Sequence, residues 1–201
     1  GVDADGNGQA AEVGLVYGHP RHFVADEPPV PQRGRVTWSV WDGQEWVRER
    51  CRLGVNCITT PEAVVRASVM RSSGALNATL RYAQDMEMWL RVASVSDVAH
   101  VNGVDQALHR DHPDSMSVNE GGGALTDLEE RRQVFAELFR VMGHLFDRPE
   151  ELERQWRRVL ADEALARATH AWERGRHDPA FHAELRSFAL ATSGGGLVRE
   201  A

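Results

Sequence analysis

The spacing of apolar residues divides the chain into two parts. Up to about residue 120, short apolar runs alternate with polar or helical stretches, beginning with the run from Val13 to Tyr17. Short β-branched runs that end at a glycine are typical of buried strands. Beyond residue 120, apolar residues recur every three or four positions, as in amphipathic helices. We therefore expect an α/β region over 1–120 and an all-helical region over 121–201, divided near a run of three glycines.

Within the α/β region, the proline-rich stretch from Pro20 to Arg35 predicts a long irregular loop. After it, Asp42 and Glu45 form a capping box, which predicts a helix that ends at Gly54. A hairpin that turns at Asp42 is the alternative, because the preceding residues TWSVW alternate in polarity. We favour the helix.

The middle of the chain contains two further segments with helical signals. Thr60 and Pro61 could cap a helix, or residues 63–65 could form a strand before a short helix that ends at Gly74. The segment DMEMWLRVAS is clearer, since its apolar residues fall at helical spacing and Asp85 stands where an N-cap is expected. The next apolar run, VAHV, predicts a second strand, and LHRDHPDSMSVNEGGG predicts a polar loop.

The last region predicts three helices. Thr126 and Glu129 form a capping box for the first, and the stretch from Asp147 to Pro149 separates it from the second. Asp178 and Pro179 open the third. The apolar positions that we expect to face inward are Leu128, Phe135, Leu138, Phe139, Met142, Phe146, Leu152, Trp156, Val159, Leu160, Leu165, Phe181, Leu185, Phe188 and Ala189.

Charge and cysteine content narrow the class of protein. With 23 basic against 30 acidic residues in a chain of 201, the net charge is -7, which argues against a nucleic-acid partner. No apolar run is long enough for a membrane span, and the N-terminus does not have the pattern of a signal peptide. Cys51 and Cys57 lie in apolar surroundings that suit reduced thiols. We therefore expect a cytoplasmic protein.

Three groups of residues could carry chemistry. Asp3 and Asp5 form a D-x-D triplet that could hold a hard divalent cation through oxygen, although short acidic termini are usually solvated. Asp85 could act as a general base or simply cap its helix. The loop that contains His109 and His112 combines imidazole, arginine and hydroxyl groups suited to a diphosphate and a metal, or is an ordinary polar surface loop.

Four stretches together resemble the second half of a family-2 glycosyltransferase with the GT-A fold. They are EVGLVYG, GVNCITTPEAVVRASVMRSSGAL, YAQDMEMWLRVASVSDVAHV and LHRDHPDSMS. The resemblance implies a partial GT-A fold (nucleotide-diphospho-sugar transferase) over 1–120, followed by an all-α C-terminal extension. It also implies that the units that bind the nucleotide base are missing, so that the chain is truncated and starts near a metal motif.

By this resemblance, the activity is inverting transfer of a sugar from a nucleotide-sugar donor to an acceptor hydroxyl. The catalytic base would be Asp85. Residues at the donor diphosphate would be Arg110, His112 and Ser117, and a divalent metal, Mg²⁺ or Mn²⁺, would be held by Asp3, Asp5 and His112. The acceptor side would include Thr59, Thr60, Gly74 and Trp89, with the region from Trp38 to Trp46 beside them.

The partners implied are a nucleotide-sugar and an acceptor that is a glycan, a lipid or a small molecule. The helical tail could pack on the catalytic fold, form a homodimer or contact another protein. The alternative function is a non-catalytic helical interaction module on a remnant glycosyltransferase scaffold.

Overall fold

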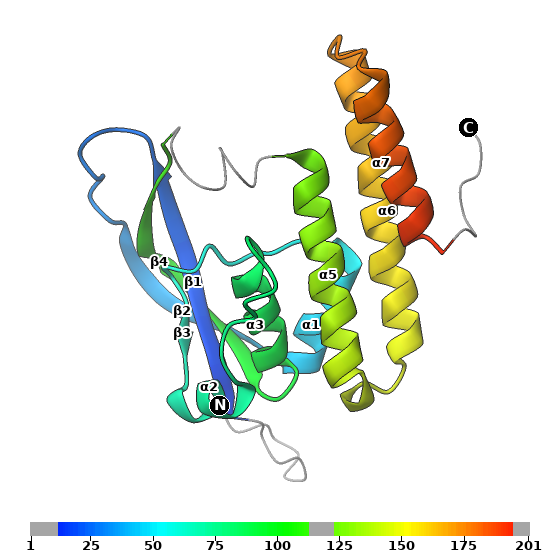
Figure 1. The fold of residues 1–201 in the computed structure, drawn as a ribbon. Coiled ribbons are helices and arrows are strands. Elements are labelled where there is room, and N and C mark those ends of the chain that lie inside the picture. Colours follow the sequence, from blue (N-terminus) through cyan, green and yellow to red (C-terminus); the bar gives the residue numbers. More distant parts are fainter. Residues whose placement is uncertain (1–11, 113–122, 195–201) are drawn as a thin grey trace. The chain divides into compact units, whose positions relative to one another are not determined.

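The computed structural model describes residues 12–112 and 123–194, which form two compact units (Figure 1). The first unit comprises the residues up to Val47, Ile58–Ala75 and Trp89–Arg110. The second comprises Arg48–Cys57, Leu76–Met88 and the residues from Asp111 onward. Strands and helices are both present, so the α/β class expected from the sequence is confirmed.

The first unit is built on a four-stranded mixed sheet with the order β2-β4-β1-β3. Its strands are β1 (Val13–Phe23), β2 (Arg33–Trp41), β3 (Val64–Val65) and β4 (Asp97–Arg110). The central strands β1 and β4 are parallel, and the two edge strands pair antiparallel with them. A parallel pair of strands in the middle of the sheet is typical of α/β folds.

Strands β1 and β4 both run further than the sequence predicts. Pairing between them continues to Phe23 and Arg110, so the irregular segment is shorter than the predicted loop of 20–35, and residues 108–110 are strand rather than loop. The register shifts on both sides of His19, immediately before Pro20. A proline has no N–H to donate, so it would interrupt regular strand pairing. It can be accommodated at such an irregularity, where the pairing is already broken. Periodicity could not reveal this non-local pairing.

The segment after β2 forms the expected helix rather than a hairpin. Helix α1 (Gly43–Leu53) begins where the N–H of Glu45 donates to the Asp42 carboxylate at 3.0 Å, and it ends at Gly54, whose φ is +71°. On the first turn, the indole N–H of Trp46 donates to the hydroxyl of Tyr17 in β1 at 3.4 Å. This contact joins the start of α1 to the core beside the sheet.

The ambiguous segment around residue 63 forms a strand followed by a short helix. Val64 and Val65 pair antiparallel with β1, and α2 (Ala67–Ser73) follows them. Gly74 ends α2 with a φ of +85°, a conformation that favours glycine. Helix α3 (Gln84–Ala93) then leads into β4, and its residues Leu90 and Val92 are fully buried.

The second unit contains the three helices expected at the end of the chain: α5 (Ala124–Met142), α6 (Pro149–Glu173) and α7 (Pro179–Thr192). A short 3-10 turn, η1 (Gly143–Leu145), follows α5. The Asp178 carboxylate caps α7, as predicted. The predicted capping box at Thr126 is wrong: α5 begins at Ala124, so Thr126 lies inside its first turn, and Gly123 is the N-cap.

Apolar side chains hold the three helices together. The rings of Phe135 in α5 and Trp156 in α6 stack with centroids 5.5 Å apart, and both side chains are fully buried. Leu185 and Phe188 contribute the buried face of α7. Beside this core, Arg131 donates to the carboxylates of Asp127 and Glu163 and to the carbonyl oxygen of Gly54.

The two cysteines are both free thiols. Cys51 is fully buried in α1, and this burial raises the pKa of its thiol to about 12, so it stays protonated and unreactive in the folded protein. Among the helices of residues 12–112 and 123–194, none combines the length and apolar character that a membrane crossing requires.

Candidate active site

Asp85 lies in the first turn of α3, which begins one residue earlier at Gln84. Its carboxylate accepts hydrogen bonds from the backbone N–H of Met86 at 2.7 Å and from the side-chain amide of Asn56 at 3.3 Å. The predicted N-cap role is wrong, since an N-cap lies outside its helix and bonds to N–H groups two or three residues further on. The half-buried carboxylate therefore bonds both to the first turn of its own helix and to the amide of Asn56.

Glu130 of α5 explains why α3 can begin before Asp85. Its carboxylate accepts the backbone N–H groups of Arg81, Tyr82 and Ala83 at distances of 3.0 to 3.2 Å. Glu130 is only 9% exposed, and hydrogen bonds to an ionised carboxylate are stronger than neutral ones. The segment that leads into α3 is thus fixed by a residue 47 to 49 positions away, which is why the sequence did not reveal this anchor.

The apolar stripe of α3 is buried as predicted. Met86 lies in the second unit, and Trp89, Leu90 and Ala93 lie in the first; all four are buried. Trp89 is 6% exposed, and no hydrogen-bond acceptor for its indole N–H is found among the described residues. A buried indole N–H usually has a hydrogen-bond acceptor, so Trp89, which the resemblance assigns to the acceptor side, is an exception.

Thr59 and Thr60, both expected on the acceptor side, lie in a turn that Glu62 closes. The buried Glu62 carboxylate accepts hydrogen bonds from the N–H and the hydroxyl of Thr59. Thr60 has a φ of +85°, the only positive φ outside glycine among the described residues. A β-branched residue rarely adopts this conformation, and the strain it stores is found most often at functional sites.

Gly74, expected on the acceptor side, lies next to α3. A Cβ at this position would lie 3.6 Å from a guanidinium nitrogen of Arg91, which belongs to α3. The same guanidinium donates to the carbonyl oxygens of Ser73 and Ala75, the residues on either side of Gly74. Arg91 therefore ties the end of α2 to the helix that carries Asp85 and Trp89.

The tryptophans from 38 to 46 have different environments. Trp38 and Trp41 are 59% and 38% exposed on edge strand β2, whereas Trp46 is buried against Tyr17. Val36 and Val40 are also exposed and share a face of β2 with Trp38, because side chains alternate along a strand. This face of β2 offers an exposed apolar surface with one indole, whereas Trp46 belongs to the core.

Of the residues expected at the donor diphosphate and metal, two lie in the described part of the chain. Arg110 is the last residue of β4, and its exposed guanidinium pairs with Asp26 at 2.8 Å. His112 is exposed two residues later. Asp3, Asp5 and Ser117 lie outside the described residues.

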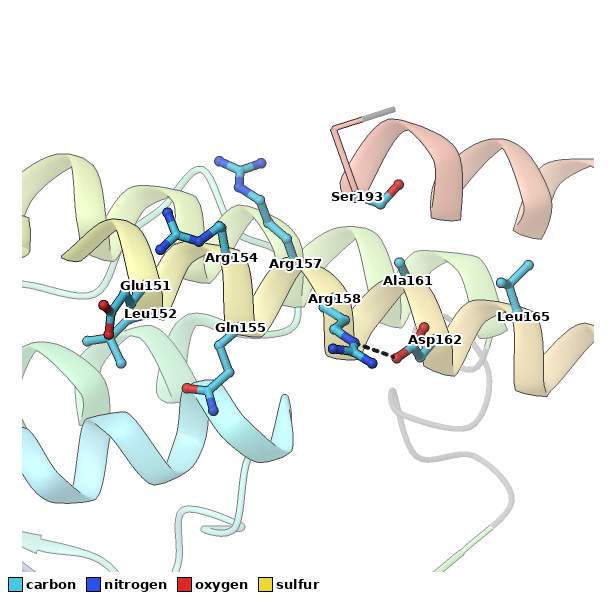
Figure 2. Close-up of a pocket in the computed structure, with 10 residues that line it drawn as sticks. All are labelled: Glu151, Leu152, Arg154, Gln155, Arg157, Arg158, Ala161, Asp162, Leu165 and Ser193. Carbon is cyan, nitrogen blue, oxygen red and sulfur yellow. Dashed lines mark ion pairs between the residues drawn. The ribbon is translucent and has the colours of Figure 1, made fainter. Parts of the chain in front are cut away.

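The second unit carries an open groove of about 980 Å³ along α6 (Figure 2). None of the expected site residues lines it. Five of its ten lining residues are charged, with both signs present, and Arg158 pairs with Asp162 at 3.6 Å. The lining residues are Glu151, Leu152, Arg154, Gln155, Arg157, Arg158, Ala161, Asp162, Leu165 and Ser193.

Comparison with known proteins finds no match for this chain among protein-family models, curated proteins or solved structures.

Proposed function

We propose that this chain supplies the catalytic base of an inverting glycosyltransferase, which moves a sugar from a nucleotide-sugar donor to an acceptor hydroxyl. The observation that carries the proposal is the position of Asp85. Its carboxylate is half-buried in the first turn of α3, and the side-chain amide of Asn56 donates a hydrogen bond to it.

In this reaction Asp85 takes the proton of the acceptor hydroxyl. The acceptor oxygen forms a bond to the anomeric carbon while the bond from that carbon to the diphosphate oxygen breaks. The electron pair of the broken bond leaves with the nucleoside diphosphate. The hydrogen bond from Asn56 keeps one carboxylate oxygen of Asp85 oriented, so that a substrate hydroxyl can meet a fixed base.

The turn at Thr60 supports an acceptor-binding role for the loop between α1 and β3. Its positive φ costs free energy, of the order of 1–3 kcal/mol for such a conformation, and a fold retains such strain where the backbone has a further task. The buried Glu62 holds this turn through two hydrogen bonds to Thr59. We therefore assign Thr59 and Thr60 to the acceptor side.

On the donor side, Arg110 is the residue best suited to pair with a diphosphate, because a guanidinium can donate two parallel hydrogen bonds to phosphate oxygens. Its present partner Asp26 is almost completely exposed, and an exposed ion pair is weak, so a diphosphate could displace it at little cost. A divalent metal, Mg²⁺ or Mn²⁺, would also neutralise the negative charge of the diphosphate. These ions prefer oxygen ligands, and of the residues expected to hold the metal only His112, an exposed imidazole, lies in the described part of the chain.

The test is the substitution Asp85→Asn in the protein expressed from the full reading frame that encodes this sequence. Transfer is measured as release of nucleoside diphosphate from a panel of nucleotide-sugars with simple glycan and lipid acceptors. Loss of a general base should lower kcat by about 10²- to 10⁴-fold. Binding of the nucleoside diphosphate, measured by calorimetry, should not change.

Glu184→Gln is the matched control, because it removes one carboxylate charge from an exposed position of α7. It should keep full activity. A D85N variant that retains the turnover of the wild type would contradict the role of Asp85 as the base.

A further inference from the structure

Two histidines face each other at the carboxyl ends of the parallel strands β1 and β4. His22 and His109 are direct register partners, and their rings lie with centroids 4.7 Å apart and planes tilted by 41°. Side chains of paired residues on neighbouring strands point to the same face of the sheet. The pairing of the strands therefore brings the two imidazoles together, although 87 positions separate them in the sequence (109 − 22).

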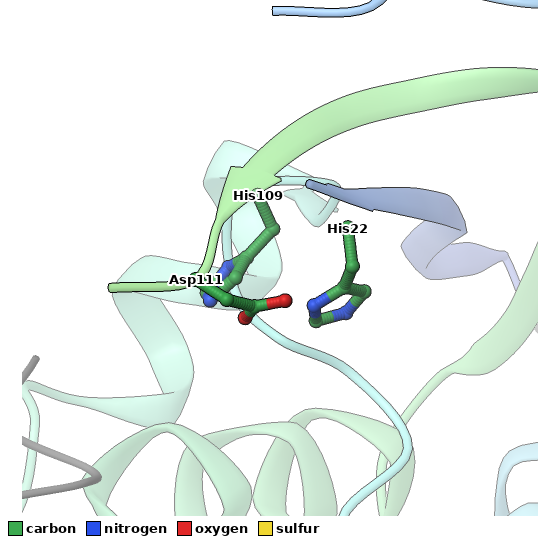
Figure 3. A group of neighbouring side chains, drawn as sticks. All are labelled: His22, His109 and Asp111. Atoms are coloured by element: carbon green, nitrogen blue, oxygen red, sulfur yellow. The ribbon is translucent and has the colours of Figure 1, made fainter. Parts of the chain in front are cut away.

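A carboxylate joins this histidine pair. Asp111 follows the last residue of β4 directly and stands two positions after His109, so the chain itself keeps it near that ring. One potential ligand atom from each of His22, His109 and Asp111 lies within 4.8 Å of the other two (Figure 3). His22 and Asp111 are exposed and His109 is half-buried, so the group is open to solvent.

The two neighbouring arginines, Arg110 and Arg21, form ion pairs with carboxylates outside this group. Arg110 follows His109 in β4, so its side chain points to the opposite face of the sheet from His109. Its guanidinium is paired with Asp26 at 2.8 Å. Arg21, the residue before His22, has Asp105 as its ion-pair partner at 3.6 Å. Both arginines are thus engaged with carboxylates other than Asp111, and their charge is partly neutralised.

Two imidazoles and one carboxylate form a ligand set that favours some divalent metal ions over others. Imidazole nitrogen suits the late first-row divalent metals, whereas Mg²⁺ and Ca²⁺ prefer oxygen ligands only. Zn²⁺ binds imidazole nitrogen and carboxylate oxygen at about 2.0–2.2 Å and accepts three protein ligands with water in the fourth position. Ligand atoms within 4.8 Å of one another need only small side-chain rotations to reach such a geometry.

We propose that His22, His109 and Asp111 bind a late first-row divalent metal ion, with Zn²⁺ as the best match, and leave one coordination position open to water. This site differs from the one expected at Asp3, Asp5 and His112, because it uses none of those residues. It also does not depend on the proposed transferase activity. The two proposals can therefore fail separately.

The experiment is a calorimetric titration of the whole metal-free chain with Zn²⁺, repeated with Co²⁺ while the visible absorption of the bound ion is recorded. We expect one Zn²⁺ per chain at this site and a Co²⁺ spectrum typical of nitrogen and oxygen ligands. His22→Ala and His109→Ala should each weaken binding by about 100-fold or more, since loss of even an outer-shell partner costs 10- to 100-fold. Asp111→Asn should weaken it as well.

His144→Ala and His112→Ala are the matched controls, because both remove an exposed imidazole that is not part of the group. Both should bind Zn²⁺ as the wild type does. Thermal unfolding gives a second measurement: Zn²⁺ should raise the Tm of the wild type and of the controls, but not that of the H22A/H109A double variant. Absence of Zn²⁺ binding, unchanged binding by H22A and H109A, or loss of binding in H112A alone would each overturn the proposal.

Discussion

At the scale of single residues, backbone segments approach one another closely at the start of α1. Gly43 is its first residue, and a Cβ at this position would lie 2.0 Å from the carbonyl oxygens of both Ala93 and Ser96. These are backbone atoms, which cannot rotate away as a side chain can. Gly175 offers a contrast: its φ is +83°, and no atom lies within 4 Å of a Cβ placed there.

Gly43→Ala should therefore destabilise the protein more than Gly175→Ala. The first variant must move backbone, which we expect to cost about 3 kcal/mol in the free energy of unfolding. Gly175→Ala brings no steric clash, so it has only the conformational cost of a positive φ, about 1–2 kcal/mol. Urea unfolding followed by circular dichroism measures both. Equal losses in the two variants would show that the close approach at Gly43 is absent in solution.

At the scale of elements, local signals predicted helices well and strand ends poorly. The capping box at Asp42 and the Asp-Pro start at Asp178 involve hydrogen bonds within one turn, so the sequence shows them directly. The continuation of β1 past Pro20 depends on pairing with β4, and the early start of α3 depends on Glu130. Neither contact leaves a local pattern, and the pairing of His22 with His109 was missed for the same reason.

The ion-pair cluster of the second unit gives an element-scale prediction of pH dependence. Burial alone would raise the pKa of Asp127 and of Glu163, but hydrogen bonds and charge from Arg131 and Arg167 lower both pKa values below their usual range. A carboxyl group whose pKa is lowered by folding stabilises the folded state above its unfolded pKa, about 4. This contribution is lost as the pH falls through the folded pKa.

Arg131→Met should cost about 2–4 kcal/mol at neutral pH, because it leaves two partly buried carboxylates with one arginine fewer. It should also make the loss of stability below pH 4 shallower than in the wild type. Thermal unfolding between about pH 2.5 and 7 measures both effects. The control is Arg140→Met, which removes an exposed pair with Glu137 and should therefore cost much less stability than Arg131→Met. An acid profile of R131M that parallels the wild type would contradict the assignment.

At the scale of the whole molecule, the net charge of -7 does not favour polyanionic partners, so a donor diphosphate would have to be recognised by local groups such as Arg110. The proposed reaction uses a single base, Asp85, and no nucleophile from the protein. One displacement at the anomeric carbon reverses its configuration. A mechanism through a covalent sugar intermediate would need two displacements and would retain it.

The configuration of the product therefore tests the central claim most directly. The protein from the full reading frame is incubated with the nucleotide-sugar that supports transfer, and the anomeric proton of the new glycosidic bond is followed by NMR from the first minutes. We predict a product with the anomeric configuration opposite to that of the donor. A product that keeps the configuration of the donor, or the absence of transfer from every nucleotide-sugar tested, would contradict the account.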